Sequence, residues 1–170
     1  LAMLGTNTIR IRSVELKGKE LGEQKRLSPF GLTRADAQML EDLLEEEVMA
    51  VSVSKKLDIQ VQSRGQVLPV DVYGTNEDFP MISGYTVQEG RFLNPLDVMR
   101  ASPVAVIGSE VRRRAFPLTD PIGKTLLIAG QPFTVIGVMA PRGQSETGTV
   151  IDVGDLDRSV YMPINAALRR

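Results

Sequence analysis

The sequence predicts an α+β fold in two parts, and three observations carry this prediction. The first half contains one clear helical pattern among several alternating strand patterns, which indicates a helix packed on a sheet. The middle, 103–139, has the pattern of a compact unit made mainly of strands. Gly84 and the polar stretch after it mark the expected boundary between the two parts. A chain of 170 residues is long enough for one compact domain or two small ones.

The first half begins with a strand pattern and continues to a helix. Residues 6–14 alternate isoleucine with arginine, which predicts a half-buried strand, and the polar stretch 17–29 predicts an exposed loop. Thr33 is expected to cap a helix whose apolar stripe consists of Ala37, Leu40, Leu43 and Leu44. The acidic run 45–47 lies at the unfavourable end of that helix. It is either a solvated end or an acidic contact surface for a partner.

Three strands and a short helix are expected next. Apolar residues alternate with polar ones in 48–54, 57–61 and 68–72. The turn 63–66 predicts that the second and third of these form a hairpin, and Pro69 places the third at an edge of the sheet. We expect a short helix over 75–82, with Asn76 as its N-cap and Pro80 limiting its length.

The remaining elements follow in a regular order. The middle unit contains a strand at 104–107, a helix at 109–116, a turn at 120–123, and strands at 125–128 and 133–139. The stretch 141–154, rich in Gly, Ser and Thr, predicts a mobile loop. A strand over 158–162 and a helix over 164–170, which Pro163 can begin, close the prediction.

Composition excludes several classes of function. A formal net charge of −1 and only 5% aromatic residues, with no Trp, argue against nucleic-acid binding. The absence of Cys and His excludes thiolate or imidazole zinc sites, Ser-His triads and cysteine nucleophiles. No stretch of about 18 apolar residues is present to span a membrane. Because the chain starts at Leu1 without an initiator Met, we expect it to be a piece of a longer protein.

Four short patterns resemble functional sites, and we assign none of them catalysis, a cofactor or a metal. Gly123-Lys124-Thr125 resembles the end of a phosphate-binding loop, but it opens a strand instead of a helix, so we interpret it as a turn. The aspartates at 152, 155 and 157 form either a calcium site or, as the prediction favours, an exposed acidic loop. Two carboxylate pairs, Asp42 with Glu45 and Glu89 with Asp97, lack evidence of a cleft between them. We expect structural roles for Gly90-Arg91-Phe92: a glycine turn or bulge, an arginine that caps or pairs, and a core phenylalanine.

A series of short motifs together resembles a known family. The motifs are, in order, Gly90-Arg91-Phe92, Asp97, Val104-Ala105-Val106-Ile107-Gly108, Phe116, Asp120-Pro121-Ile122-Gly123-Lys124, Phe133 and Val135-Ile136-Gly137-Val138. Their order and spacing closely resemble the extracytoplasmic (periplasmic) core domain of MacB-type ABC-transporter permeases, the MacB/FtsX/LolC-like family. The opening 4–7 and the closing 161–164 resemble that family's exit from and return to the membrane.

The resemblance implies a specific domain organisation. It predicts a porter-like α/β lobe built from both chain ends, 1–83 and 155–170, and a smaller, mainly β lobe inserted between them over 84–154. Such a domain lies between two transmembrane helices of a permease, at the extracytoplasmic face of the cell membrane.

The resemblance also implies a function without catalysis in this chain. It predicts mechanical coupling of cytoplasmic ATP hydrolysis to the movement of a substrate or partner protein outside the membrane. No cofactor is expected in this chain, whereas ATP and Mg are expected in the cytoplasmic nucleotide-binding part of the parent transporter. The expected partners are a second permease copy or a paired permease, the cytoplasmic ATPase, and a periplasmic adaptor with an outer-membrane exit duct.

Two other functions and one contact surface are also considered from the sequence. The alternative function is a stand-alone extracytoplasmic module that binds a peptide or lipid in an apolar groove. A carboxylate-based hydrolase is a third class, and it needs two carboxyl groups across a cleft. The polar stretch 144–157 is expected to contact a partner at the tip of the middle lobe.

Overall fold

The computed structural model describes residues 9, 11, 34–43, 49–142 and 155–168, and these fall into two units. The first unit, Leu1–Val51, contains α2 (Arg34–Leu43), which confirms the predicted helix. The expected cap at Thr33, the acidic run 45–47 and most of the strand at 6–14 lie outside the described residues. The second unit, Ser52–Arg170, contains all of the described strands.

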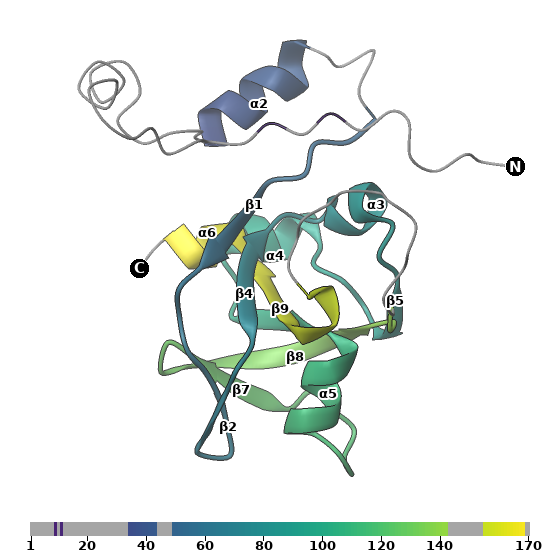
Figure 1. Ribbon diagram of the computed structural model, residues 1–170. Helices are drawn as coiled ribbons and strands as arrows, with labels where there is room; N and C mark the ends of the chain where they lie inside the picture. Colours follow the sequence, from purple (N-terminus) through teal and green to yellow (C-terminus); the bar gives the residue numbers. More distant parts are fainter. Residues whose placement is uncertain (1–8, 10, 12–33, 44–48, 143–154, 169–170) are drawn as a thin grey trace, which may run out of the picture. The chain divides into compact units, whose positions relative to one another are not determined.

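The second unit is built on one mixed sheet of nine strands (Figure 1). Its order is β1-β4-β9-β6-β8-β7-β2-β3, and β5 pairs with β8 beside this path. The strands are β1 (Ser54–Leu57), β2 (Val61–Ser63), β3 (Gln66–Leu68), β4 (Asp71–Thr75), β5 (Val87–Gly90), β6 (Val104–Ile107), β7 (Thr125–Ile128), β8 (Gln131–Met139) and β9 (Ser159–Pro163). This mixture of helices and a sheet confirms the predicted α+β class.

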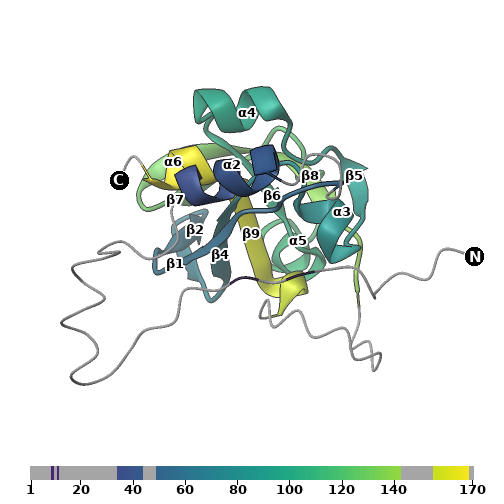
Figure 2. The same cartoon turned by 90° about the horizontal axis from the view of Figure 1, so that it is seen from above.

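Four short helices and one 3₁₀ turn accompany the sheet (Figure 2). They are α3 (Phe79–Ser83), α4 (Pro95–Arg100), α5 (Ser109–Ala115), η1 (Leu156–Arg158) and α6 (Ile164–Leu168). In the middle unit, the strands at 104–107 and 125–128 and the helix at 109–116 are confirmed almost to the residue. Among these described helices and that of the first unit, none combines the length and apolarity that a membrane span requires.

The strand predictions before residue 75 were only partly right. The expected strands 57–61 and 68–72 are each interrupted, so that β1 and β2 are separate, and β3 and β4 are separate. The second interruption has a local cause: Pro69 has no N–H to donate, and the N–H of Val70 bonds to Leu68 O at 3.0 Å. The predicted hairpin at 63–66 is confirmed, with Ser63 opposite Gln66.

The short helix after β4 begins later than predicted. Thr75 belongs to β4, and Asn76 does not cap a helix, because its Oδ1 accepts a hydrogen bond from Val53 N at 3.1 Å. Asp78 is the N-cap residue of α3, and Pro80 stands at the start of the helix instead of limiting it. Gly84 ends α3 with φ of 63°, the left-handed conformation that glycine adopts without strain.

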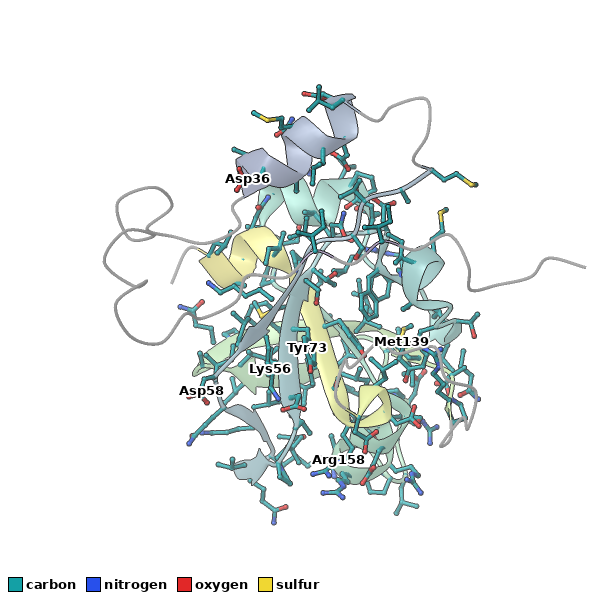
Figure 3. The ribbon with its side chains drawn as sticks, turned by 45° about the horizontal axis from the view of Figure 1, so that its top comes forward. Asp36, Lys56, Asp58, Tyr73, Met139 and Arg158 are labelled. Atoms are coloured by element: carbon teal, nitrogen blue, oxygen red, sulfur yellow. The ribbon has the colours of Figure 1, made fainter. Side chains whose placement is uncertain are left out.

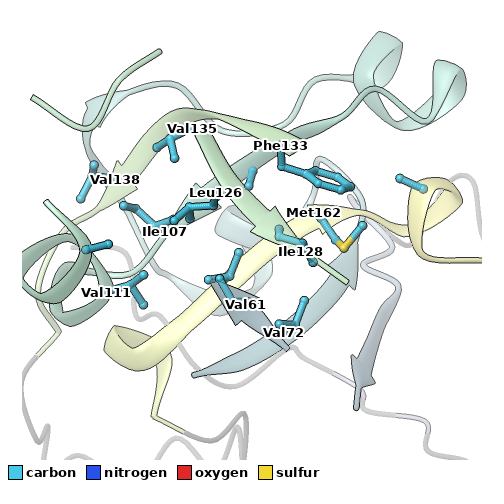
Figure 4. Close-up of a cluster of buried hydrophobic side chains, with 14 of the residues drawn as sticks. Val61, Val72, Ile107, Val111, Leu126, Ile128, Phe133, Val135, Val138 and Met162 are labelled. Atoms are coloured by element: carbon cyan, nitrogen blue, oxygen red, sulfur yellow. The ribbon is translucent and has the colours of Figure 1, made fainter. Parts of the chain in front are cut away.

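The buried side chains form two clusters on this frame. The first contains Val61, Val72, Leu126, Phe133 and Met162 among others, and Figure 4 shows these side chains converging from β2, β4, β7, β8 and β9. The second is rich in aromatic residues and surrounds Tyr161. The residues of β9 are buried throughout, which places this strand at the centre of the unit.

The sheet runs through both boundaries predicted between the two lobes. β2, from the range 1–83, pairs with β7 of the range 84–154, and β6 of that middle range pairs with β9. The division into a porter-like lobe over 1–83 and 155–170 and an inserted lobe over 84–154 stays a prediction.

Candidate functional site

The stretch 144–157 is the candidate for contact with a partner. The structure describes its last residues, 155–157, and the chain just before it, up to Arg142. The chain leaves β8 through Ala140 and Arg142, and it is described again from Asp155, at the start of η1. Residues 143–154, including Asp152, lie outside the described residues. We call the described residues around these two ends the anchor site: Ser83, Tyr85, Arg142 and Asp157.

Asp157 joins the two ends of this stretch to a third segment of the chain. Its Oδ1 accepts a hydrogen bond from the Tyr85 hydroxyl at 2.8 Å. Both carboxylate oxygens accept from Arg142 N, at 3.2 and 3.3 Å. The Arg142 side chain then donates from Nη1 to Ser83 O at 2.8 Å. One carboxylate therefore holds together the end of α3, the exit from β8 and η1.

The two tyrosines near this carboxylate stay protonated at ordinary pH. Burial raises the pKa of Tyr85 far above its usual value of 10, and the hydrogen bond to Asp157 adds to this effect. Burial likewise raises the pKa of Tyr161. Each phenol therefore acts as a neutral hydrogen-bond donor, and neither is suited to be a general base.

Gly108 brings the end of β6 against the anchor site. Its N–H bonds to Ser159 O at 2.8 Å, and a Cβ at this position would clash with the backbone oxygens of Leu156 and Asp157. The glycine that ends the apolar run 104–107 is therefore required by a close backbone approach. The approach fixes where η1 begins relative to the sheet.

An aromatic cluster around Tyr161 packs against the anchor site and includes Tyr85. Tyr161 on β9 lies with its ring centroid 4.9 Å from Phe79, 6.1 Å from Tyr73, 6.2 Å from Phe92 and 6.3 Å from Tyr85. Figure 3 labels Tyr73 and Met139, two members of the same buried group. Such ring pairs add about 0.5–1.5 kcal/mol each beyond their buried area. These ring contacts hold Tyr85, and with it the anchor site, against β9.

The motif Gly90-Arg91-Phe92 has the structural roles that the sequence predicted. Gly90 has φ of 73° and lies opposite Gly137 of β8, and a Cβ on either glycine would clash with a backbone oxygen across the pair. Arg91 Nη1 bonds to Asp97 Oδ2 at 2.6 Å, and Phe92 packs on the aromatic cluster.

Asp97 has a second role at the start of α4. It forms a capping box with Asn94, whose Oδ1 accepts from Asp97 N at 2.8 Å. Burial by itself would raise the pKa of Asp97, but the bonds from Arg91 and from Asn94 N outweigh it and lower the pKa below 3.8.

The predicted carboxylate pair of Glu89 and Asp97 does not form a catalytic arrangement. Glu89 lies 3.7 Å from Arg112 on α5, whereas Asp97 pairs with Arg91, so each carboxylate faces its own arginine. Glu45 of the other pair lies outside the described residues. Among the described residues, no three acidic side chains are grouped as a metal ion would need.

The Gly123-Lys124-Thr125 segment is a turn, as the sequence predicted. Lys124 N bonds to Pro121 O at 3.0 Å across the turn, and Gly123 supplies the positive φ of 77°. Pro121 is the first residue of this turn, and Asp120 accepts a bond from Ile122 N at 2.9 Å. The side chains present therefore do not form a phosphate cradle here.

Sequence reasoning missed Tyr85 and Arg142, whose partners lie far along the chain. Tyr85 and Asp157 are 72 positions apart, and no local pattern links them. Taken together, the anchor site joins donors from Tyr85 and Arg142 to one carboxylate and to one backbone oxygen, beside a packed aromatic cluster. This arrangement is suited to holding the ends of a segment in place.

Comparison with known proteins agrees with these observations. Residues 2–170 match the family described as the MacB-like periplasmic core domain. The macrolide export ATP-binding/permease protein MacB of Nitrobacter winogradskyi is 31% identical over 169 residues, which are 98% of this chain and 24% of that protein. The pyoverdine export ATP-binding/permease protein PvdT of Pseudomonas aeruginosa is 41% identical over 96 residues, which are 56% of this chain and 14% of that protein.

Two solved structures show the same fold. The periplasmic region of MacB from Actinobacillus actinomycetemcomitans superposes with a TM-score of 0.64 at 21% identity, over 91% of this chain and 64% of that one. The extracellular domain of the transporter YknZ from Gram-positive bacteria gives 0.66 at 22% identity, over 84% and 68%. The chain spans about a quarter of the length of its full-length relative from Nitrobacter. Since the family match covers nearly every residue, this chain belongs to the MacB-like periplasmic core domain family.

Proposed function

We propose that this chain is a non-catalytic extracytoplasmic domain that couples ATP hydrolysis on the cytoplasmic side to movement outside the membrane. The observation that carries the proposal is the family match over residues 2–170. Relatives named ATP-binding/permease proteins support an ATP-binding part, with its ATP and Mg, elsewhere in the parent protein or in a partner subunit. What moves is a substrate or a partner protein.

The connections of the second unit suit this role. The chain enters its sheet at Ser54 of β1 and continues into α6 after β9, and α6 packs against β1 and β4 (Figure 1). Both connections therefore lie at one end of the unit. β4 and β9 pair in parallel over five residues, so a pull on either connection acts directly on the centre of the sheet. The unit would then move as one body.

The same proposal assigns the partners. A second permease copy or a paired permease completes the transporter, and a periplasmic adaptor with an outer-membrane exit duct receives what is moved. Coupling requires that ATP favours one arrangement of the two copies over the other, because a ligand shifts an equilibrium only by its differential affinity.

The test uses the full transporter in lipid nanodiscs, with its ATP-binding part. This chain has no Cys, so once any cysteines elsewhere in the transporter are replaced, a single Lys124→Cys change places a spin label at an exposed position of the second unit. The distance between labels on two copies is expected to change when ATP and Mg are added. A control protein carries labels at Lys55 and Lys124 of one copy, and the distance between these should stay constant.

An unchanged distance between the copies, with ATP hydrolysis intact, would contradict the coupling. The isolated chain offers a second check, because it is expected to show no ATP binding. Measurable ATP affinity of the 170-residue chain would count against a non-catalytic domain.

The alternative module for peptides or lipids has less support. The second unit has surface hollows of about 280 and 210 Å³, which are below the roughly 300–1,000 Å³ of small-molecule sites. Charged and polar side chains, with a few apolar ones, line both hollows. Neither of these hollows is an apolar ligand groove of the expected kind.

A further inference from the structure

The β2–β3 hairpin leaves one edge of the sheet without a neighbouring strand. β3 ends the strand order and pairs only with β2 among the described strands. Ser63 and Gln66 flank the two-residue turn, so they form the pair that exchanges both backbone hydrogen bonds. The next pair, Gln62 and Val67, is then not hydrogen-bonded. Val67 therefore directs its N–H and C=O away from β2, toward the free edge.

A hollow of about 210 Å³ lies beside this edge. It is lined by Ser63, Arg64, Gln66, Leu68, Arg114, Ala115 and Pro117, which come from the hairpin and the end of α5. Two of these residues are cations, and none carries a carboxylate. Arg114 pairs with Glu110, and Arg64 Nη2 makes only a long 3.5 Å bond to Thr119 Oγ1. The hollow is therefore lined by two guanidinium groups, one of which is already paired with a carboxylate.

Ser63 adds a polar group that the fold itself does not use. The residue is 7% exposed, and its hydroxyl oxygen is buried without a hydrogen-bond partner within the described structure. Leaving a buried hydroxyl unpaired in this way is unfavourable.

A second hollow continues along the same stretch of backbone. It measures about 280 Å³ and is lined by Pro69, Val70, Asp71, Asp155 and Arg158. Arg158, labelled in Figure 3, donates from Nη2 to Pro69 O at 3.2 Å, while its Nε is buried without a partner in the described structure. The two hollows thus follow the chain from β3 toward the start of β4.

The free edge lies at the end of the unit opposite its connections. Figure 1 shows the hairpin at the bottom of the view, whereas α6 and the start of β1 lie above it, at the other end of the second unit. Exposed apolar side chains accompany the edge: Val67 is 56% exposed, and Leu118, beside the hollow in sequence, is 95% exposed. A partner approaching this end meets a strand edge, arginines and apolar side chains together.

We propose that the free edge of β3 binds an extended, acidic segment of a partner protein as an added strand. Val67 would supply the backbone hydrogen bonds, and Arg64 and Arg114 would meet carboxylates of the segment. An acidic occupant follows from the cationic lining of the first hollow. The inference rests on the proposed function only in that a domain outside the membrane has a protein partner.

The test selects binders from a phage-displayed library of short random peptides, using the complete 170-residue chain. Selected peptides are expected to alternate apolar residues with Asp or Glu. Their affinity is then measured by fluorescence anisotropy for the chain and its variants. Binding should weaken as salt rises, because the charges lie at an exposed surface.

The decisive variant is Val67→Pro. It removes the outward N–H without removing a bond to β2, so affinity should fall about tenfold or more. Val67→Thr keeps the N–H and should bind like the original chain. Val67→Glu repels an acidic segment and should also weaken binding, which gives a second variant if the proline disturbs folding. Arg64→Asn should weaken binding several-fold.

Four outcomes would overturn the proposal. The library yields no binder, or its binders are basic, or they bind Val67→Pro and Val67→Glu as well as the original chain. In the fourth outcome, the Val67 amide is protected from hydrogen exchange before any peptide is added, which would mean that the edge is already covered. In that case, the sedimentation coefficient shows whether the edge is covered by a second copy, which makes a dimer, or by a segment of the same chain, which leaves a monomer. None of these measurements uses ATP or the membrane, so failure here is distinguishable from failure of the coupling test.

Discussion

The pairing of β5 with β8 around Gly90 and Gly137, called the crossing below, is packed more closely than the β2–β3 hairpin. At the crossing, Gly90 faces Gly137 without room for a Cβ, and Arg91 is paired with Asp97. At the hairpin, a Cβ on Gly65 would meet nothing within 4 Å, and Val67 is exposed. The short motifs that resemble the family mark the crossing, whereas the hairpin carries none of them. Recognisable motifs here report close packing, and the surface left for a partner lies elsewhere.

The largest effect is expected from closing the space at the crossing. Gly137→Ala places a methyl group against Arg91 O and should destabilise the protein by about 3–5 kcal/mol, since a backbone clash cannot relax cheaply. Urea unfolding followed by circular dichroism measures this change.

Gly130→Ala is the matched control, because its Cβ would meet nothing within 4 Å. Its cost should be only about 1 kcal/mol, from the positive φ of 77°. Equal losses for the two variants would show that the crossing is not the tighter region.

The next effect concerns the ion pair beside the crossing. Asp97→Asn removes the charge that Arg91 Nη1 contacts and should cost about 2 kcal/mol at neutral pH, because the Asp97 side chain is only 10% exposed. Lys56 and Asp71 provide the comparison. Their side chains are 60% and 34% exposed, so Asp71→Asn should cost well under about 1 kcal/mol.

The cost of Asp97→Asn should depend on pH. Because folding lowers the pKa of Asp97 below its usual 3.8, its stabilisation is fully present above that value and is lost as pH falls through the folded value. The difference between the two proteins in free energy of unfolding should therefore be constant above about pH 5 and shrink in stronger acid. A difference that grew on acidification would contradict this assignment.

A smaller effect is expected where β5 begins. Tyr85→Phe removes the hydroxyl that donates to Asp157 and should cost about 1 kcal/mol, since Arg142 N still satisfies the carboxylate. Thermal unfolding measures the loss. Tyr161→Phe serves as the comparison, because its bond to Leu156 O is longer, at 3.4 Å, and should contribute less.

The smallest effect has the opposite sign and lies in the hairpin. Arg64 and Gly65 have φ of 51° and 79°, the values of a type I′ turn, in which asparagine is favoured at the first position. Arg64→Asn should therefore stabilise the protein by about 0.5 kcal/mol. Arg64→Val, which tolerates positive φ poorly, should destabilise it, and a gain from valine would refute the turn assignment.

Elements set by local chemistry could be predicted from the sequence. The turn at Gly65, the strand at 104–107 and the start of β7 at Thr125 follow from nearby residues and were found close to their positions. The start of α3 was wrong because Asn76 bonds to Val53, a partner 23 positions away. Asparagine is a favoured N-cap residue, but here its side-chain oxygen accepts a hydrogen bond from the backbone of Val53 instead.

The candidate site was less predictable than the fold. The tie between Tyr85 and Asp157 requires that β5 and η1 meet, which depends on how β9 enters the sheet. The same holds for the free edge of β3, since period-two alternation does not reveal which strand lacks a neighbour. The sequence placed the strand 68–72 at an edge because of Pro69, and this was right only for Leu68, which lies in β3 at the end of the strand order. Asp71 and Val72 belong to β4, which lies between β1 and β9.

The position of β9 also has a consequence for how the domain forms. β9 is the last of the described strands along the chain, yet it lies between β4 and β6 and pairs with both. During synthesis, β4 and β6 are complete while the strand that joins them is still missing. Their open edges are then available to other chains, and the sheet closes only when residues 159–163 arrive. Loss of this one strand would divide the sheet in two, so shortening the chain before Ser159 should abolish folding instead of weakening it gradually.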